Sequence, residues 1–210
     1  AQCPCNNLPS SAGVQVLTDA IARAAAAGIT VVASAGNDGD TVLRYPACLS
    51  TTISVGATFD KGYPYAPTVA GSFPTTGTFH QAGGASFADC NHTTPVVADQ
   101  LVCFSNRSTC MDFAAPGYNI TSVQLGNNTT NLNSYGTSQA AAHVTAALAL
   151  LQQAAPQLTN AQMLQLLHAT AVKVPLNQSV PTGSQVDRID ILHAINKATL
   201  ADVKDWMIFN

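Results

Sequence analysis

Two patterns of apolar residues alternate along the first sixty positions of this 210-residue chain. Residues 12–28 are rich in alanine and carry apolar side chains at helical spacing, and Gly28 offers a natural helix end. Residues 29–34 and 51–57 are instead short, β-branched and continuously apolar, which is typical of strands buried on both faces. A helix followed directly by a buried strand predicts an α/β domain with a parallel sheet.

The second half of the chain returns to the same alternation. The expected elements are a strand, an Ala-Pro-Gly turn and a second strand over 111–124, then helices over 137–155, 161–171 and 188–198. The first of these helices is apolar almost throughout and is expected to end at Pro156, because proline cannot continue a helix. Thr159 or Asn160 is expected to cap the next helix.

The stretch from residue 60 to about residue 98 has a different texture. It is rich in glycine, proline, threonine and aromatic residues and shows no strong periodicity. Because it is longer than an ordinary connection between elements, we interpret it as a surface insertion. The expected organisation is one partial domain over 1–198 that carries this insertion, followed by a C-terminal extension over 199–210.

The composition is apolar and poor in charge. Hydrophobic residues make up 47% of the chain and charged residues only 9%, whereas about a quarter of a soluble protein is usually charged. The net charge is −3, with no run of lysine or arginine, so neither nucleic acid nor an anionic membrane is an expected partner. No apolar run reaches the roughly 20 residues that span a bilayer. The N-terminus has no apolar signal region, so a secretion signal is expected upstream.

Six cysteines and several glycosylation sequons indicate the secretory route. Cys3 and Cys5 are one residue apart and no zinc-type spacing with histidine occurs, so disulfides are favoured over a metal site, with the pairing left open. The N-x-S/T sequons begin at Asn91, Asn106, Asn119, Asn127, Asn128 and Asn177. These features predict a secreted, disulfide-bonded glycoprotein.

Three short motifs follow one another in a particular order. They are SAGND at 34–38, DFAAPG at 112–117 and YGTSQAAAHV at 135–144. With a helix and a buried strand before the first and a long apolar helix after the last, they resemble the subtilisin-like serine proteases. Supporting likeness comes from YPACLSTTISVGAT at 45–58, CFSN at 103–106 and DRIDILHAI at 187–195. The resemblance covers residues 8–58 and 99–198.

The resemblance implies that Ser138 is the catalytic nucleophile, with its own backbone N–H as one donor to the oxyanion. A serine hydroxyl needs a neighbouring base before it attacks a carbonyl. The first turn of a helix supplies unpaired N–H groups and a partial positive charge that favour the resulting oxyanion. Gly136 allows a substrate backbone to approach closely, and Thr137 is able to cap the helix.

The resemblance also assigns Asn37 as the second oxyanion donor, through its side-chain amide. Asn37 follows a buried strand, and ligand sites of open α/β sheets form at the carboxyl ends of strands. The strand end that borders the primary specificity pocket in the family corresponds to Ala33, Ser34, Ala35 and Gly36. His143, five residues after Ser138 on an apolar helix, is expected to be structural and not the base.

The chain departs from the family pattern at its start. The family's Asp-Ser/Thr-Gly and His-Gly-Thr motifs, which carry the catalytic aspartate and histidine, are absent here. Three explanations stay open: the chain is part of a longer product, it is one chain of a processed two-chain protease, or it is a non-catalytic remnant. Gln139, Ala142 and Ala146 also replace the family's usual methionine, proline and glycine.

The predicted fold is three-layered α/β, with a mainly parallel sheet, helices on both faces and the N-terminal strands missing. The predicted function is serine endopeptidase of the subtilisin type, with a protein or peptide substrate and the missing N-terminal part of the domain as partners. The alternative is a secreted pseudoprotease that binds peptides or proteins without cleaving them. The chemistry requires no cofactor and no catalytic metal. Structural calcium often accompanies the family, but no acidic cluster here identifies its ligands.

Overall fold

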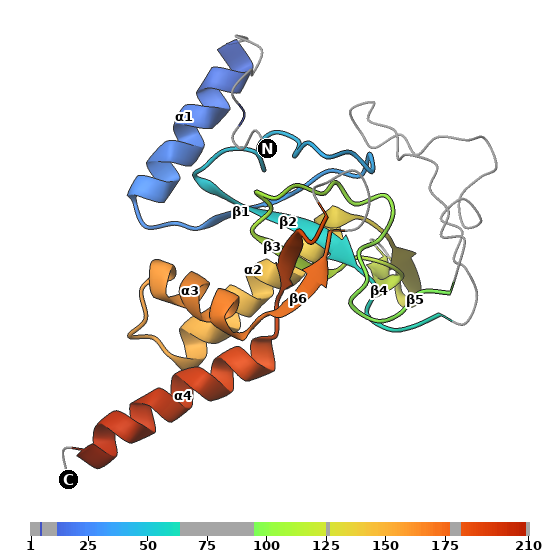
Figure 1. The fold of residues 1–210 in the computed structure, drawn as a ribbon. Helices are drawn as coiled ribbons and strands as arrows, with labels where there is room; N and C mark the ends of the chain where they lie inside the picture. Colours follow the sequence, from blue (N-terminus) through green and yellow to red (C-terminus); the bar gives the residue numbers. More distant parts are fainter. Residues whose placement is uncertain (1–4, 6–11, 64–94, 125–126, 177–181, 209–210) are drawn as a thin grey trace, which may run out of the picture.

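The computed structural model describes residues 5, 12–63, 95–124, 127–176 and 182–208 (Figure 1). For 123–133 and 200–208 only the backbone is considered. Most of the expected insertion at 60–98, and the sequons at Asn91 and Asn177, lie outside the described residues.

The described chain forms four helices and seven strands. In order they are α1 (Ala12–Ala26), β1 (Val31–Ser34), β2 (Thr52–Thr58), β3 (Phe113–Pro116), β4 (Ile120–Gln124), β5 (Asn127–Ser134), α2 (Thr137–Ala154), α3 (Asn160–Thr170), β6 (Val172–Pro175), β7 (Gln185–Arg188) and α4 (Ile191–Ile208). The strands β5, β6 and β7 had no prediction from the sequence. Helix α4 starts three residues later than expected and continues without a break into residues 199–208 of the predicted C-terminal extension.

One mixed, mostly parallel sheet organises the domain. Its strand order is β1-β2-β3-β7-β6, and all neighbours are parallel except the antiparallel pair β6 and β7. Strands β4 and β5 form a separate antiparallel hairpin. Helix α2 packs against β1, β2 and β3, and in Figure 1 it lies with α3 and α4 below the sheet while α1 lies above it. The sheet and its helices confirm the predicted α/β class.

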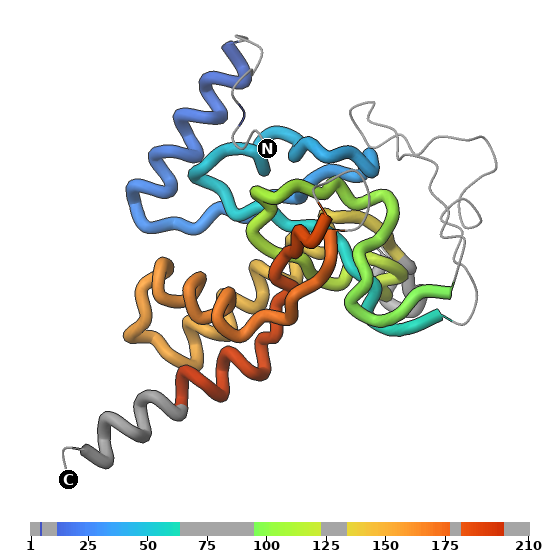
Figure 2. The backbone as a smooth tube through the Cα atoms, in the orientation of Figure 1, coloured from blue at the N-terminus to red at the C-terminus, as the bar shows by residue number. Residues whose placement is uncertain are grey.

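The two faces of the sheet cover different cores. Phe113 and Ala115 of β3 belong to the core shared with α2, α3 and α4, whereas Ala114 between them belongs to the other core. This alternation follows from the two-residue period of a strand. The second core lies beneath loops, which contribute Leu43 and Met111. Two loop segments, 35–48 and 101–111, therefore sit side by side over this face (Figure 2).

The two edges of the sheet differ in how they are protected. Strand β6 carries Lys173 and Pro175, which are typical guards of an exposed edge. Strand β1 has the sequence Val-Val-Ala-Ser, without charge or proline, and pairs within the described residues only with β2. Val31 and Val32 are only half-buried, so the prediction that this strand is buried on both faces is not met by this chain on its own.

Apolar side chains are also uncovered on two helices. Helix α2 exposes Ala142, Ala146, Ala149 and Leu150, the last at 48%, although a helix that is apolar all round is normally buried. On α1, Val16 and Leu17 are 66% and 44% exposed. We call the free edge of β1 together with these six residues the uncovered surface.

Two further observations bear on the sequence predictions. Cys5 and Cys48 form a disulfide, and Cys103 and Cys110 are disulfide-bonded as well. Within the described ranges, no cluster of three histidine, cysteine or acidic side chains is arranged to hold a metal ion. In the same ranges no helix has the length and hydropathy of a membrane span.

Candidate active site

Two motifs that lie far apart in the sequence meet at the carboxyl end of β1. The chain leaves β1 at Ser34 and turns through Gly36 to Asn37, while α2 begins at Thr137. The backbone N–H of Gly36 donates to Thr137 Oγ1 at 3.3 Å. Gly36 and Gly136 have φ angles of 111° and 147°, in a region that favours glycine. The fold therefore brings together the residues predicted to form the site.

The side chain of Asn37 is held by Thr137. Asn37 Oδ1 accepts hydrogen bonds from the backbone N–H and from the hydroxyl of Thr137, both at 2.9 Å. Because a backbone N–H can only donate, its partner must be the amide oxygen, and this orients the Asn37 amide. Asn37 Nδ2 then remains as a donor, and it lies 3.5 Å from the position that a Cβ on Gly136 would take.

Thr137 does not cap α2, contrary to the sequence prediction. The N-cap is Gly136, without a side-chain cap, and Thr137 is the first helical residue. Its hydroxyl is engaged instead by Asn37 and Gly36. Apart from the Thr137 N–H, whose hydrogen bond Asn37 Oδ1 accepts, no side chain in the described residues caps the N–H of Ser138, and such an N–H is what an anion-binding helix end requires.

Ser138 is the second residue of α2 and is exposed. Neither its hydroxyl nor its backbone N–H has a hydrogen-bond partner in the described part of the chain. The nearest histidine along α2, His143, is exposed, and its Nδ1 lies 2.9 Å from the carbonyl oxygen of Gln139 one turn away. Among the described residues, then, no base contacts Ser138.

A second glycine contact fixes the approach to α2. The backbone N–H of Gly136 donates to the carbonyl of Gly117 at 2.8 Å. A Cβ on Gly117 would lie 2.6 Å from Ala57 Cβ and 2.7 Å from Gly136 O, so only glycine fits there. The turn of the DFAAPG motif thereby sets the distance between β3 and the start of α2.

Comparison with known families settles the relationship. Residues 6–190 match the family described as "Subtilase family". The chain belongs to the subtilase family. It is 31% identical over 158 residues to the minor extracellular protease Epr of Bacillus subtilis, and 32% identical over 159 residues to an extracellular serine proteinase of Thermus sp.. It is also 29% identical over 165 residues to a thermostable alkaline protease of Halalkalibacterium halodurans.

This subtilase chain spans only part of those relatives. The matches cover 75%, 75% and 79% of the chain but 18%, 30% and 35% of the three relatives in turn. The family match includes all three motifs quoted above, because 34–38, 112–117 and 135–144 lie within 6–190. The resemblance inferred from these motifs is confirmed at the level of the family.

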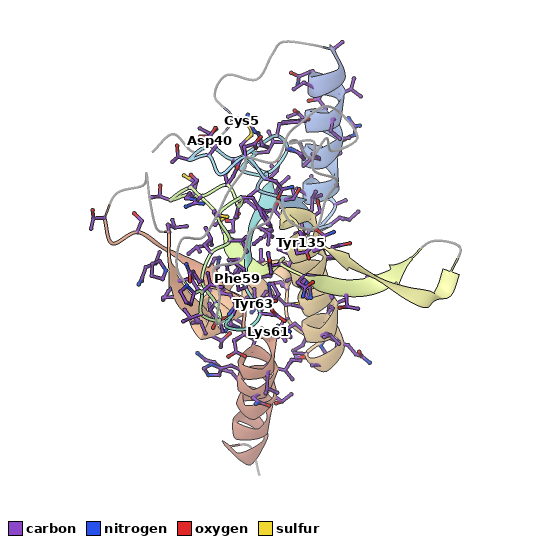
Figure 3. The ribbon with its side chains drawn as sticks, turned by 90° about the vertical axis from the view of Figure 1, so that its right-hand side faces the viewer. Cys5, Asp40, Phe59, Lys61, Tyr63 and Tyr135 are labelled. Atoms are coloured by element: carbon purple, nitrogen blue, oxygen red, sulfur yellow. A yellow bond between two sulfur atoms is a disulfide. The ribbon has the colours of Figure 1, made fainter. Side chains whose placement is uncertain are left out.

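An aromatic cluster packs against Tyr135, the first residue of the motif at 135–144. Tyr135 packs on Tyr118 at 4.9 Å between ring centroids, and Tyr118 packs on Phe59 at 4.7 Å. Phe59 and Tyr63 lie next to each other in Figure 3, 5.8 Å apart. The Tyr135 hydroxyl also donates to Asn119 Oδ1 at 3.3 Å. Because these residues are scattered over 59–135, no local pattern in the sequence pointed to the cluster.

The strand end expected to border the specificity pocket is tightly enclosed. Ala33 and Ala35 are 8% and 0% exposed, and Ser34 is half-buried. A Cβ on Gly36 would lie 2.5 Å from Asn106 Nδ2 and 2.6 Å from Arg44 Cγ. Side chains from both loop segments, 35–48 and 101–111, thus pack directly against the backbone of this strand end.

Asp38 and Arg44 form an ion pair beside this strand end. Arg44 Nε donates to Asp38 Oδ2 at 2.8 Å. This hydrogen bond, together with one from Asn106 and the nearby charge, lowers the pKa of Asp38 below its ordinary value against a smaller effect of burial. A lowered carboxyl pKa stabilises the folded state above the unfolded pKa, about 4, and this contribution is lost as the pH falls through the folded pKa.

Replacing Arg44 by glutamine is therefore expected to raise the pKa of Asp38 toward its ordinary value. The methylene packing against Gly36 is retained while the charge is removed. An NMR titration of the Asp38 carboxyl measures the shift. Arg23→Gln, at the end of α1, serves as the control and leaves the Asp38 titration unchanged. An Asp38 pKa that is unchanged in Arg44→Gln contradicts the assignment of Arg44 as the main cause of the lowered pKa.

The structure separates the glycosylation candidates. Asn106 is 0% exposed and its amide is hydrogen-bonded inside the protein, so a glycan at Asn106 is incompatible with this fold. Asn119 is half-buried and accepts from Tyr135. Asn127 and Asn128 begin strand β5 of the hairpin, where only the backbone is considered. The correction for Asn106 has a simple cause: a sequon records three residue types and contains no information about burial.

Proposed function

We propose that this chain is the C-terminal part of the catalytic domain of a subtilisin-like serine endopeptidase. The observation that carries the proposal is the fixed amide of Asn37. Its oxygen is occupied by Thr137, and its Nδ2 is left beside the uncapped helix start that presents Ser138. This pairs a serine hydroxyl with two donors for a developing oxyanion, namely Asn37 Nδ2 and the Ser138 N–H.

The proposed reaction is acyl transfer followed by hydrolysis. Ser138 Oγ attacks the peptide carbonyl carbon while its proton passes to a base, and the carbonyl oxygen becomes the oxyanion bound by the two donors. The base returns the proton to the leaving amine as the C–N bond breaks, and water then releases the acyl group by the same steps. By family resemblance, the base is a histidine oriented by an aspartate. No cofactor is required.

We place this histidine and aspartate in a segment upstream of residue 1 that packs on the uncovered surface. The edge of β1 has no charged residue or proline to prevent pairing with another strand, and one apolar face of α2 is exposed. Both features fit the docking of such a segment. The much greater length of the relatives supports it too, since the chain accounts for 18–35% of them. Below, the complete domain means this chain joined to that segment.

We further propose that the protein is secreted and acts on peptides or proteins outside the cell. The disulfide-bonded cysteines support an oxidising compartment. Two of the relatives are named extracellular. Asn119, Asn127 and Asn128 stay candidates for glycosylation, and structural calcium in the complete domain stays a proposal without assigned ligands.

The docking of the upstream segment is tested with two exposed leucines. In the complete domain, Leu150→Ala on the uncovered face of α2 is expected to cost about 2–5 kcal/mol of unfolding free energy, because Leu150 becomes buried. Leu192→Ala on α4 is the matched control, since Leu192 is 68% exposed here, and it is expected to stay within about 0.5 kcal/mol.

Chemical denaturation of both variants measures the difference. Equal, small effects at the two leucines contradict the docking of a segment on α2. Peptide hydrolysis by the complete domain is assayed in parallel. A complete domain that is stably folded and binds peptides without hydrolysing them favours the pseudoprotease alternative instead.

A further inference from the structure

We infer that Asn106 is a positioning residue for Asn37, an inference that rests on the proposed function. Asn106 lies in the loop 101–111, while Asn37 follows β1, yet the two loops lie side by side (Figure 2). Backbone hydrogen bonds join them at several points. Asn106 is 0% exposed, so its amide is not open to a substrate. It acts by holding the backbone that carries Asn37.

Asn106 bonds to the residues on both sides of Asn37. Its backbone N–H donates to the carbonyl of Gly36 at 2.9 Å, and its Oδ1 accepts from the backbone N–H of Asp38 at 2.8 Å. The peptide units just before and just after Asn37 are therefore both fixed by one residue. Because Thr137 holds the side-chain oxygen of Asn37, hydrogen bonds fix both the backbone around Asn37 and the orientation of its amide.

The remaining capacity of the Asn106 amide is used within the same loop. Oδ1 also accepts from the N–H of Asp40 at 3.2 Å, and Nδ2 donates to Val42 O at 2.9 Å and to Asp38 Oδ2 at 3.1 Å. Two acceptor and two donor positions are the whole capacity of an amide side chain. Asn106 is also 0% exposed, so its amide forms these hydrogen bonds away from bulk water.

This set of partners requires an amide. Aspartate at 106 would accept from the two N–H groups but could not donate to Val42 O, and it would place a second carboxylate beside Asp38. Serine or alanine would leave buried backbone groups without partners. The position of the Asn106 amide also requires glycine at residue 36, because a side chain there would occupy the space of Asn106 Nδ2.

The kinetic test uses the complete domain. Asn106→Ala is expected to lower kcat about 10–100-fold with KM within about twofold, because a misplacement of about 1 Å can cost about 10²-fold in rate. In an Asn37→Ala background the same change is expected to have no further effect on kcat. Asp112→Asn is the control: Asp112 accepts from the N–H and hydroxyl of Ser54 across two strands, away from Asn37. It is expected to lower stability and leave kcat unchanged.

The inference is overturned if the fall in kcat caused by Asn106→Ala or Asn106→Asp is as large in the Asn37→Ala background as in the parent. The two effects would then multiply, and Asn106 would not act through Asn37. A fall in kcat for Asp112→Asn equal to that for Asn106→Ala also overturns it, because destabilisation alone would explain both. Asn106→Asp tests the same point with little change in volume and is expected to lower kcat as Asn106→Ala does.

A spectroscopic readout separates this inference from the proposed function. The side-chain NH₂ signal of Asn37, assigned by its loss in Asn37→Ala, is recorded by NMR on the folded complete domain with ¹⁵N-labelled asparagine. It is expected to shift or broaden in Asn106→Ala and to stay in place in Asp112→Asn, whether or not the protein hydrolyses peptides. An Asn37 signal unchanged in folded Asn106→Ala overturns the positioning role, even if the domain proves to be an active peptidase.

Discussion

Replacing Ser138 by alanine in the complete domain is expected to lower kcat for peptide hydrolysis about 10⁶-fold, which is the loss that removal of the nucleophile causes in subtilisin, a member of this family. The reason is that the neighbouring hydroxyl at the helix start, that of Thr137, is already engaged by Asn37 Oδ1 and by the N–H of Gly36. Without Oγ no acyl-enzyme forms, and the two oxyanion donors are left with water as the only nucleophile. Hydrolysis of a chromogenic peptide, followed at saturating substrate, measures the loss.

Thr145→Ala is the matched control for Ser138→Ala. Thr145 is also exposed on α2, and its hydroxyl donates to the carbonyl of Ala141 one turn back. Its removal is expected to leave kcat unchanged. A Ser138→Ala protein that retains more than about one-thousandth of the activity contradicts the assignment of Ser138 as nucleophile, because the residual rate of such variants comes only from binding and the oxyanion donors.

Replacing Asn37 by aspartate is expected to lower kcat about 10²–10³-fold with little change in KM, the range known for loss of the corresponding asparagine in this family. Aspartate has the same shape, so one of its oxygens can still accept from the N–H and hydroxyl of Thr137. The other oxygen takes the place of Nδ2, which removes a donor and sets a negative charge against the oxyanion. The folded state is retained while the transition state loses its stabilisation.

Asn160→Asp is the control for this exchange of amide for carboxylate. Asn160 starts α3, where a carboxylate is favoured by the helix dipole, and its amide bonds to the carbonyl of Gly28 far from the site. Steady-state kinetics of the two variants are compared with the parent. An Asn37→Asp enzyme with unchanged kcat would show that the amide hydrogen of Asn37 does not bind the oxyanion.

The parts of the site that could be predicted are those that depend on local order along the chain. A buried strand that ends in Ser-Ala-Gly-Asn and a helix that begins with Gly-Thr-Ser each have a local physical signature. Parallel strands then place the carboxyl ends of β1 and β3 at one edge of the sheet, and the hydrogen bond from Gly136 to Gly117 after β3 brings the start of α2 to that edge. The boundaries of α1, α2 and α3 were predictable for the same reason.

Other features could not be predicted because their cause lies far away in the sequence. Strand β5 is rich in asparagine, which is depleted in strands, and it exists because it pairs with β4. Asn106 resembles a surface sequon and is instead a buried hub, since its partners are sixty to seventy residues distant. Thr137 resembles a helix cap, but tertiary contact with Asn37 takes its hydroxyl away from the helix.

The uncovered surface connects these two groups of observations. The sequence predicts a strand buried on both faces at 29–34 and an almost wholly apolar helix from 137, and the structure leaves the edge of β1 and one face of α2 exposed. The local prediction of apolar elements is therefore correct, while their burial is expected to depend on the proposed upstream segment. The same segment would supply the base that Ser138 lacks, so completeness of the core and of the site are expected to depend on one docking event.

The most direct test of the central claim is covalent labelling of the complete domain with a fluorophosphonate, followed by peptide mapping. This reagent reacts with serines that a base activates. The account predicts stoichiometric modification of the peptide that contains Ser138, little or no reaction of residues 1–210 produced without the upstream segment, and none in Ser138→Ala. Labelling that persists in Ser138→Ala, or a folded complete domain in which Ser138 does not react, would contradict it.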